Sequence, residues 1–580
     1  MSTKDQSHLN TFINDHILPI WVKASDLFVK CLESEEVEYV FGIPGEETND
    51  LVLSISESKR IKFILVRHEQ AAAFMADVYG RLTNKVGVCL ATLGPGATNL
   101  ATGVANANMD RSPILAITGQ TFTNQMHKES HQNMDPVTMF TPITKWTWSI
   151  RDADGIPEIV RRAFKIALEE KKGATHLELP VDVAKSKSLL KPLNKRRRDS
   201  SNLSTLNLVE AAKMIINARA PVVLIGNGCI RNRSSDAIRE FLDATGIYSV
   251  NTFMGKGVVS DKTPTHLGTI GIKESDFALR ALKLADLIIT IGYDLVEYSP
   301  RNWNGSIPLK KIIHFDFTTA ETDNFYDPDL EIYGNIELSI NSLMDSLNRL
   351  NPGYNIQQSK HKETKRLIKV FKKIRDEVES RIDKFQYDNT YPIKPEKLIH
   401  DVRESLSSSD ILLSDVGAHK LWIAKVYRTF EPNTCLISNG FCSMGFALPG
   451  AIGAQLAYPS KKVVAMCGDG GFLMNVQELE TAVRLELPII VIVWCDYDLG
   501  VISTKQKLEL GKSVFTRFQN PDFVKLAESF GAIGYKIVRT ADFKTIFHKA
   551  KMSSKKPVII AIDIDASRNK LLFDMDTTSS

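Results

Sequence analysis

The stretch KVVAMCGDGGF, residues 462–472, joins an apolar run to a glycine-rich turn that contains one acid, Asp469. An apolar run of this length is typical of a strand buried on both faces, as in parallel sheets. Residues 475–485 then carry apolar side chains at helical spacing. Backbone amides beside Gly470 and Gly471 can approach a phosphate closely, and the N-terminus of a following helix favours an anion. The stretch therefore predicts a strand, turn and helix that together bind a phosphorylated ligand.

A second group of acids follows the next apolar run of this region. Residues 489–494 form that run, and Asp496 and Asp498 come directly after it. Because neighbouring parallel strands end at the same edge of a sheet, we expect Asp469 and Asp496 to lie close together. A carboxylate binds a phosphate only through a cation, and Mg²⁺ is commonly held by one or two carboxylates together with a diphosphate. The pattern therefore predicts a magnesium diphosphate site.

Short apolar runs alternate with helical patterns along the rest of the chain, which predicts parallel βαβ units. The runs are residues 39–41, 63–66, 86–92, 114–118 and 176–179, then 221–225, 287–291 and 312–317, then 411–414, 463–467, 489–494 and 558–562. We expect an α/β fold of three doubly wound parallel-sheet domains. The expected divisions are an N-terminal extension (1–19), a first domain (20–190), a linker (191–204), a central domain (205–350), a charged helical connector (351–390), a third domain (391–568) and a tail (569–580).

Composition limits the class of protein. The 580 residues are 43% hydrophobic and carry a net charge of only +4. A chain of this length buries several cores, and the charge balance argues against binding to nucleic acid or to a membrane surface. The seven cysteines form no CxxC pair, the first twenty residues lack the apolar centre of a signal peptide, and no apolar run reaches the ~18 residues of a membrane span. We therefore expect a cytoplasmic protein that acts on a small molecule.

The turn at 468–471, together with Asp496, resembles the diphosphate and metal motif of the thiamine-diphosphate enzymes. The resemblance implies that the side chains of Asp469 and Asp496 and the backbone carbonyl of Asp498 bind Mg²⁺, and that Gly470 and Gly471 contact the diphosphate. Much of that family has Asn at the second metal position. Asp at this position is similar to the branch of catabolic acetolactate synthases. The first domain would then bind the pyrimidine of the cofactor, and the third its diphosphate.

Further motifs match the family in order along the chain. The segment VRHEQAAAFMA, residues 66–76, resembles the one whose acid, here Glu69, hydrogen-bonds the aminopyrimidine ring and helps to activate the cofactor. The loops FGIPG (41–45) and ATLGPGATN (91–99) resemble the walls of the pyrimidine site, and DVGAH (415–419) and NGFCSMG (439–445) resemble the diphosphate and thiazolium loops. The resemblance assigns to the cofactor Pro44, Glu69, Thr92, Asn99, Gly417, His419, the carbonyl of Cys442, Met444, Asp469, Gly470 and Gly471.

Two segments resemble the catabolic acetolactate synthases most closely. These are SHQNMD (130–135), followed by FTPITK (140–145), and TIGYDLVEY (290–298). By position, Gln132 would face the reaction centre and His131 would assist it. Tyr293 and Asp294 stand where flavin-binding relatives carry an Arg-containing segment, which makes FAD doubtful.

One position departs from that branch. Glu46 and Glu47 follow Gly45, where the catabolic enzymes commonly have a Lys that could meet a carboxylate substrate. Because a loop after a Pro-Gly pair can turn its side chains to water, we expect both glutamates to face solvent.

The resemblance implies an acetolactate synthase that condenses two pyruvate molecules, with loss of CO₂, to 2-acetolactate. It also implies a homodimer or homotetramer with the site between subunits. Three reactions of the same cofactor class remain alternatives: an oxalyl-CoA-type decarboxylase, an aldehyde carboligase and an acetyl transferase. A non-catalytic paralogue is a further alternative, although such proteins tend to lose the acid or the metal ligands, and Glu69, Asp469 and Asp496 are all present.

Overall fold

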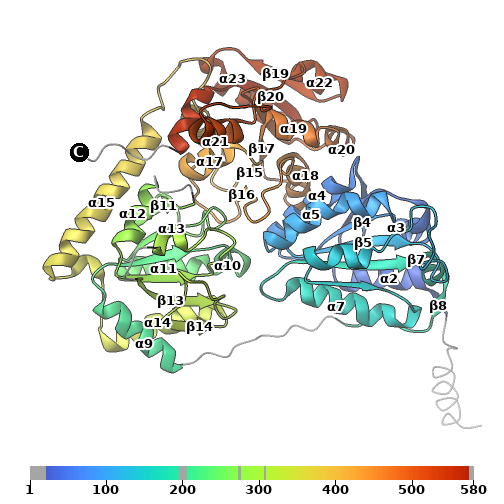
Figure 1. Ribbon diagram of the computed structural model, residues 1–580, viewed down its shortest axis with the longest axis horizontal. Coiled ribbons are helices and arrows are strands. Elements are labelled where there is room, and N and C mark those ends of the chain that lie inside the picture. Colours follow the sequence, from blue (N-terminus) through green and yellow to red (C-terminus); the bar gives the residue numbers. More distant parts are fainter. Residues whose placement is uncertain (1–20, 195–204, 272–275, 306–308, 574–580) are drawn as a thin grey trace, which may run out of the picture. The chain divides into compact units, whose positions relative to one another are not determined.

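The computed structural model describes residues 21–194, 205–271, 276–305 and 309–573 (Figure 1). The expected N-terminal extension, most of the expected linker and the last residues of the expected tail lie outside these ranges. The chain forms two compact units. The first holds the described residues within Met1–Ala76, Lys85–Asn108 and Pro113–Arg197, and the second holds the rest.

The first unit contains a parallel six-stranded sheet with the order β3-β2-β4-β5-β7-β6. Its strands are β2 (Tyr39–Gly42), β3 (Lys62–Leu65), β4 (Gly87–Ala91), β5 (Ile114–Gln120), β6 (Trp146–Ser149) and β7 (Ala174–Pro180). The sequence predicted five of these strands and missed β6, a partly exposed edge strand. The chain leaves β2 toward one edge of the sheet and β4 toward the other. The carboxyl ends of β2 and β4 therefore flank the crevice where sheets of this kind bind ligands.

Helices follow most of these strands. They are α2 (Ala24–Ser34), α3 (Asn49–Glu57), α4 (Glu69–Thr83), α5 (Pro95–Met109), α6 (Pro136–Phe140), α7 (Ile156–Leu168) and α8 (Val181–Lys185). Helix α7 shows why they pack. Ile156, Val160, Ala163 and Phe164 recur at helical spacing and are buried against the sheet and α2, while the charged side chains of α7 lie on its other face. A two-stranded antiparallel ribbon, β1 (Val22–Lys23) with β8 (Lys187–Ser188), joins the ends of this unit.

The second unit contains two further parallel six-stranded sheets. The central sheet has the order β11-β10-β9-β12-β13-β14. Its strands are β9 (Pro221–Ile225), β10 (Tyr248–Asn251), β11 (His266–Thr269), β12 (Leu287–Ile291), β13 (Lys311–Asp316) and β14 (Leu330–Tyr333). Its helices are α9 (Thr205–Asn217), α10 (Gly228–Arg231), α11 (Ser235–Thr245), α12 (Phe277–Leu284), α13 (Arg301–Asn304) and α14 (Ile336–Leu350).

The third sheet has the order β16-β15-β17-β18-β20-β19. Its strands are β15 (Ile411–Ser414), β16 (Cys435–Ile437), β17 (Val463–Gly468), β18 (Ile490–Cys495), β19 (Ile533–Ile537) and β20 (Val558–Asp563). Its helices are α16 (Pro395–Ser405), α17 (Ala418–Val426), α18 (Ala447–Ala457), α19 (Asp469–Met474), α20 (Glu478–Arg484), α21 (Gly500–Leu510), α22 (Phe523–Ser529) and α23 (Phe543–Lys551). Together the three parallel sheets confirm the predicted α/β fold class.

The charged connector is helix α15 (Lys362–Asp383), which packs on α12 and β11 (Figure 1). Leu367, Phe371 and Ile374 form its buried stripe. The prediction for the helix after the glycine turn was wrong at its start. The helix begins at Asp469, within the turn itself, and breaks at residues 475–477 before α20. No helix in the described ranges is both long enough and apolar enough to cross a membrane.

Candidate active site

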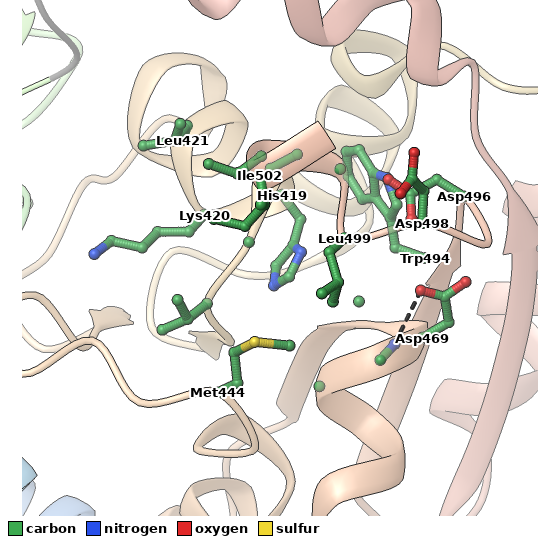
Figure 2. Close-up of a pocket in the computed structure, with 18 of the residues that line it drawn as sticks. His419, Lys420, Leu421, Met444, Asp469, Trp494, Asp496, Asp498, Leu499 and Ile502 are labelled. Atoms are coloured by element: carbon green, nitrogen blue, oxygen red, sulfur yellow. Dashed lines mark hydrogen bonds between the residues drawn. The ribbon is translucent and has the colours of Figure 1, made fainter. Parts of the chain in front are cut away.

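In the third sheet the strand order reverses between β15 and β17, because the chain continues from β15 to one side and from β17 to the other. A cavity of about 360 Å³ lies where the loops leave the carboxyl ends of these strands. Its lining comes from the loop after β15, from Met444 and from the glycine turn after β17. Figure 2 shows Asp469, Asp496 and Asp498 together on one side of the cavity, with the His419 ring and Met444 projecting into it from other elements. The structure thus brings together the residues that the sequence assigned to the diphosphate half of the site.

Asp469 is the first residue of α19 and is almost fully buried. One carboxylate oxygen accepts a hydrogen bond from the Gly470 amide (2.9 Å), and the other accepts from the Tyr497 amide (2.9 Å) and the Asn520 side chain (2.7 Å). Burial raises the pKa of this carboxyl group although these donors oppose the shift. The donors hold the carboxylate in one orientation at the end of β17.

Asp496 follows β18, the strand beside β17, as the sequence predicted. Burial, reinforced by the negative charge of Asp469, raises the pKa of Asp496 to about 7. Gly500 lies directly against it, since a Cβ at this position would be 2.5 Å from Oδ2 of Asp496. Only glycine leaves room for the carboxylate where it lies.

A divalent cation fits this group of acids. The charge of the buried Asp469 helps to raise the pKa of Asp496, and a buried side-chain oxygen of Asp498 has no hydrogen-bond partner within the described residues. A cation bound between the acids would offset both the repulsion and the burial. The described ranges contain no group of three or more His, Cys, Asp or Glu side chains arranged for a metal. Two carboxylates, a backbone carbonyl and diphosphate oxygens would therefore have to complete the shell.

His419 is buried in the wall of the cavity. Burial lowers its pKa to about 3, so the ring is neutral at pH 7. Its Nε2 atom has no partner within the described residues and lines a site that a diphosphate would occupy. The ring packs closely over Gly468, whose Cβ would be 3.2 Å from Cε1 of His419. Gly417 lies in the same loop and also lines the cavity.

Hydrogen bonds to Asp415 fix the loop that carries Cys442 and Met444. The carboxylate of Asp415 accepts hydrogen bonds from the Gly445 amide (2.9 and 3.2 Å), and the side chain of Asn475 donates to the Gly445 carbonyl (2.8 Å). Gly445 has φ +83°, a left-handed conformation that few other residues adopt. This turn places Met444 over the cavity, where the family resemblance predicts it.

The first unit holds the other half of the predicted site. Glu69 begins α4, is 8% exposed, and accepts a hydrogen bond from Nδ2 of Asn99 (3.0 Å). A Cβ at Gly96 would lie 3.4 Å from Oε1 of Glu69 and 3.0 Å from the methyl group of Thr92. Glu69, Thr92 and Asn99, three of the predicted cofactor residues, therefore lie together at the switch point of the first sheet.

The loops around these residues also meet. A Cβ at Gly45, next to Pro44, would lie 2.3 Å from Cβ of Thr92. Gly94 has φ +58°, and a Cβ there would lie 2.7 Å from the carbonyl oxygen of Gln132. Gln132 thus lies against the glycine loop of this half-site. Its side chain and that of His131 are exposed, and their roles stay predictions.

The expectation that both Glu46 and Glu47 face water is wrong for Glu47. Glu46 is exposed, but Glu47 is half-buried and accepts a hydrogen bond from Oγ1 of Thr92 (2.6 Å). The reason is the close approach of the two loops, which turns Glu47 toward Thr92. Glu47 therefore lies beside Thr92, one of the residues predicted to contact the pyrimidine.

Two contacts were not predicted from the sequence. Asn520, the partner of Asp469, lies in a loop with no motif of its own. Lys420, directly after His419, lines the cavity with its Nζ 3.0 Å from Oδ1 of Asn439 and 2.6 Å from Sγ of Cys442. Its position after His419 was a signal that could have found it. No sequence signal indicated that Asn520 contacts Asp469, because the two residues are far apart in the sequence.

Comparisons with known proteins show the family to which the chain belongs. The N-terminal TPP binding domain of thiamine pyrophosphate enzymes matches residues 22–139, their central domain matches 208–343, and their C-terminal TPP binding domain matches 415–562. The chain therefore belongs to the thiamine pyrophosphate enzymes.

Similar proteins narrow the class. The chain is 35% identical to the acetolactate synthase of Bacillus subtilis over 94% of each chain. It is 32% identical to the catabolic acetolactate synthase of Raoultella terrigena, over 95% of this chain and 97% of the relative. It is also 30% identical to a putative thiamine pyrophosphate-containing protein of Bacillus subtilis, YdaP, over 93% and 91%. The protein is a thiamine-diphosphate-dependent enzyme of the carboligase type.

Proposed function

We propose that this enzyme is an acetolactate synthase that requires thiamine diphosphate and Mg²⁺ and condenses two pyruvate molecules, with loss of CO₂, to 2-acetolactate. The observation that carries the proposal is the pair of half-sites, combined with the similarity to acetolactate synthases over nearly the whole chain. When bound, thiamine diphosphate supplies an acidic carbon that adds to a keto group and an electron sink for the loss of CO₂.

In this proposal the residues of the third domain bind and orient the diphosphate end of the cofactor. Asp469 and Asp496 hold Mg²⁺ with the backbone carbonyl of Asp498, and the amides of Gly470 and Gly471 face the diphosphate. His419 is neutral and can donate to a diphosphate oxygen through its free nitrogen. Met444, which lines the cavity opposite the acids, would support the bound cofactor from that side.

The residues of the first unit move a proton at the pyrimidine end. Glu69 exchanges a proton with the pyrimidine ring, and Asn99 fixes the carboxyl group in place through its hydrogen bond. Since Glu69 and the metal acids belong to different units, we further propose, as the family resemblance implies, that the complete site forms between subunits of a homodimer or homotetramer.

FAD is not expected in the central domain. The loops after β9 and β12, which flank its ligand crevice, bond to each other backbone to backbone, Gly228 N to Gly292 O at 2.8 Å. Beside them the buried ring of Tyr293 packs against Trp303 and Tyr326, with centroids 5.8 and 5.4 Å apart. The closed backbone contact and the packed rings support the expectation, made from the sequence, that FAD is doubtful.

The position of Glu47 favours one second candidate. A carboxylate in the pyrimidine half-site disfavours a second carboxylate nearby, and an aldehyde acceptor carries none. The second candidate is therefore a carboligase that transfers the two-carbon unit of pyruvate to an aldehyde.

Mass spectrometry of products separates the two candidates. The enzyme with thiamine diphosphate and Mg²⁺ is incubated with pyruvate alone and with pyruvate plus acetaldehyde. Acetolactate from pyruvate alone supports the proposal. Acetoin only when the aldehyde is added supports the second candidate.

A further inference from the structure

One of the seven cysteines differs from the rest in its surroundings. All seven lie in the described ranges, and Cys442 alone is not buried. Each of the other six is at most 6% exposed, and burial raises the pKa of Cys89 and Cys435, for example, to about 12. Such thiols are inert, because the thiolate is the reactive form. Cys442 is partly exposed and lines the cofactor cavity, so a small oxidant in the cavity can reach it.

A lysine amine is in contact with this thiol. Nζ of Lys420 lies 2.6 Å from Sγ of Cys442. Lys420 also lines the cavity, although it is only 5% exposed, and Figure 2 shows its side chain extending away from the three acids. An amine and a thiol, both nucleophilic when deprotonated, therefore meet in the cavity wall.

Hydrogen bonds hold this pair together. Nζ of Lys420 donates to Oδ1 of Asn439 (3.0 Å). Asn439 is fixed in turn, because its side chain donates to the carbonyl of Glu297 (2.7 Å) and its amide to the carboxylate of Asp110 (3.1 Å). Cys442 has φ +61°, a conformation that residues with a side chain adopt rarely and only where the surroundings hold it. The contact between sulfur and nitrogen is thus built into the loop.

From this geometry we propose that Lys420 and Cys442 form a site of reversible oxidation. A peroxide converts the contact between Nζ and Sγ into a covalent S–N bond, a sulfenamide, which joins the two side chains.

The reaction consumes one molecule of hydrogen peroxide. The thiolate of Cys442, whose charge the Lys420 ammonium stabilises, attacks one peroxide oxygen, so that an S–O bond forms and the O–O bond breaks. Lys420 gives a proton to the departing hydroxide, which leaves as water. The neutral amine then attacks the sulfenic sulfur, so that the S–N bond forms, the S–O bond breaks and a second water leaves. The sulfur loses two electrons and the peroxide gains them.

The amine decides whether the oxidation can be reversed. A sulfenic acid that no nucleophile captures is oxidised further to a sulfinic acid, which thiols do not reduce. A sulfenamide is cleaved by a thiol, which releases the amine and leaves a mixed disulfide that a second thiol reduces. Lys420 therefore protects the sulfur of Cys442 from irreversible oxidation.

The bridge also has a consequence for the cofactor cavity. Lys420 follows His419 in α17, and Cys442 precedes Met444 in its loop, and all four residues line the cavity. A covalent S–N bond is shorter than the 2.6 Å contact, so the bridge draws the loop and the helix together. Cofactor affinity should therefore fall on oxidation and return on reduction. This consequence, unlike the bridge itself, rests on the proposed cofactor site.

The test treats the full chain, without cofactor, with hydrogen peroxide and maps the products by mass spectrometry. The wild type should give a pair of joined peptides that carry Lys420 and Cys442 and are lighter than the separate peptides by two hydrogens. Dithiothreitol should release them. The buried thiol of Cys89 is the internal control and should stay unmodified.

The decisive variant is Lys420→Arg, which keeps the positive charge but cannot lose a proton to become a nucleophile. Lys425→Arg makes the same change in the same helix, outside the lining of the cofactor cavity. We expect at least ~10-fold less joined peptide in Lys420→Arg than in Lys425→Arg, with Cys442 found as sulfenic acid, trapped by dimedone, or as sulfinic acid. Should Lys420→Arg fold poorly, Cys442→Ser provides the same comparison and should give no joined peptide.

Two results in the wild type would overturn the proposal. One is oxidation of Cys442 to sulfinic acid without any joined peptide, which would show that the amine does not capture the sulfur. The other is a Cys442 that remains a free thiol, as Cys89 does.

Calorimetry tests the consequence for the cofactor. The Kd of thiamine diphosphate in the presence of Mg²⁺ should be at least ~3-fold higher in the bridged wild type than in the same sample after dithiothreitol. An equal Kd in both samples would contradict the effect of the bridge on the cofactor. Failure of the untreated enzyme to bind thiamine diphosphate would instead contradict the proposed cofactor site. None of these measurements uses turnover of pyruvate, so they stand or fall separately from the proposed reaction.

Discussion

Thr92 donates a 2.6 Å hydrogen bond to the carboxylate of Glu47, and this contact places a negative charge in the half-site that would hold the pyrimidine. Two charges ~6 Å apart interact by a few kcal/mol at an effective dielectric of about 20. Glu47 is half-buried, so solvent screens only part of this effect. Substrate preference should therefore depend on Glu47.

Glu47→Gln should lower the Michaelis constant for pyruvate by roughly three- to tenfold, because it removes a charge that repels the substrate carboxylate. Steady-state kinetics on pyruvate measure this. Glu46→Gln, at the exposed neighbour, is the matched control and should change the constant by less than about twofold. Identical constants for both variants would show that the Glu47 carboxylate does not face the substrate.

Gly500→Ala should weaken Mg²⁺ binding at least ~10-fold, because a Cβ would lie 2.5 Å from Oδ2 of Asp496 and force that carboxylate aside. Titration of thiamine diphosphate at several Mg²⁺ concentrations gives the value. Asp496→Ala should have a larger effect, and Glu509→Ala, at an exposed position of the same helix, should have none. If Gly500→Ala and Asp496→Ala both bind the cofactor with wild-type Mg²⁺ dependence, the metal lies elsewhere.

Glu69→Gln should reduce turnover at least ~10²-fold while the cofactor still binds, because an amide cannot exchange the proton with the pyrimidine ring. Turnover and calorimetric affinity are measured on the same preparation. Glu57→Gln, an exposed acid at the end of α3, is the control for the charge change. Near-wild-type turnover in Glu69→Gln would remove this residue from the mechanism.

His176 should make the protein less stable as the solution becomes more acidic. Burial lowers its pKa to about 3, below the ~6.5 of an unfolded histidine. The unfolded chain therefore binds the proton first, and stability falls with decreasing pH below about 6.5, by up to ~1.4 kcal/mol per pH unit.

Urea unfolding between pH 6.5 and 4.5 tests this as a difference between variants, since carboxyl groups also titrate in this range. His176→Gln should lose stability less steeply than the wild type on acidification, whereas His548→Gln, at an exposed site, should follow the wild type. Parallel curves for His176→Gln and wild type would show that folding does not lower the pKa of this histidine.

The sequence predicted the strands that carry the site because they are central in their sheets. Strands such as β17 and β18 are buried on both faces and therefore read as unbroken apolar runs. The edge strands β6, β14 and β19 are partly exposed and therefore show no such run. Strand β10 shows none because its sequence, YSVN, is polar. Edge strands are specified by their neighbours more than by their own residues.

The candidate site divides in the same way. The adjacency of Asp469 and Asp496 follows from parallel topology alone, and the structure confirms it. The direction of the Glu47 side chain depends on the loop after β4. That loop brings Oγ1 of Thr92 within 2.6 Å of the Glu47 carboxylate. The partnership of Asn520 with Asp469 likewise joins segments that no local pattern connects. Such contacts are set by tertiary packing, which residue spacing does not record.

The most direct test of the proposed function is the product formed from pyruvate alone by the purified enzyme with thiamine diphosphate and Mg²⁺. Mass spectrometry should find 2-acetolactate and CO₂ in equal amounts, dependent on both cofactors and reduced at least ~10²-fold in Glu69→Gln. The absence of 2-acetolactate, under conditions where the same preparation binds thiamine diphosphate and Mg²⁺, would contradict the proposed reaction.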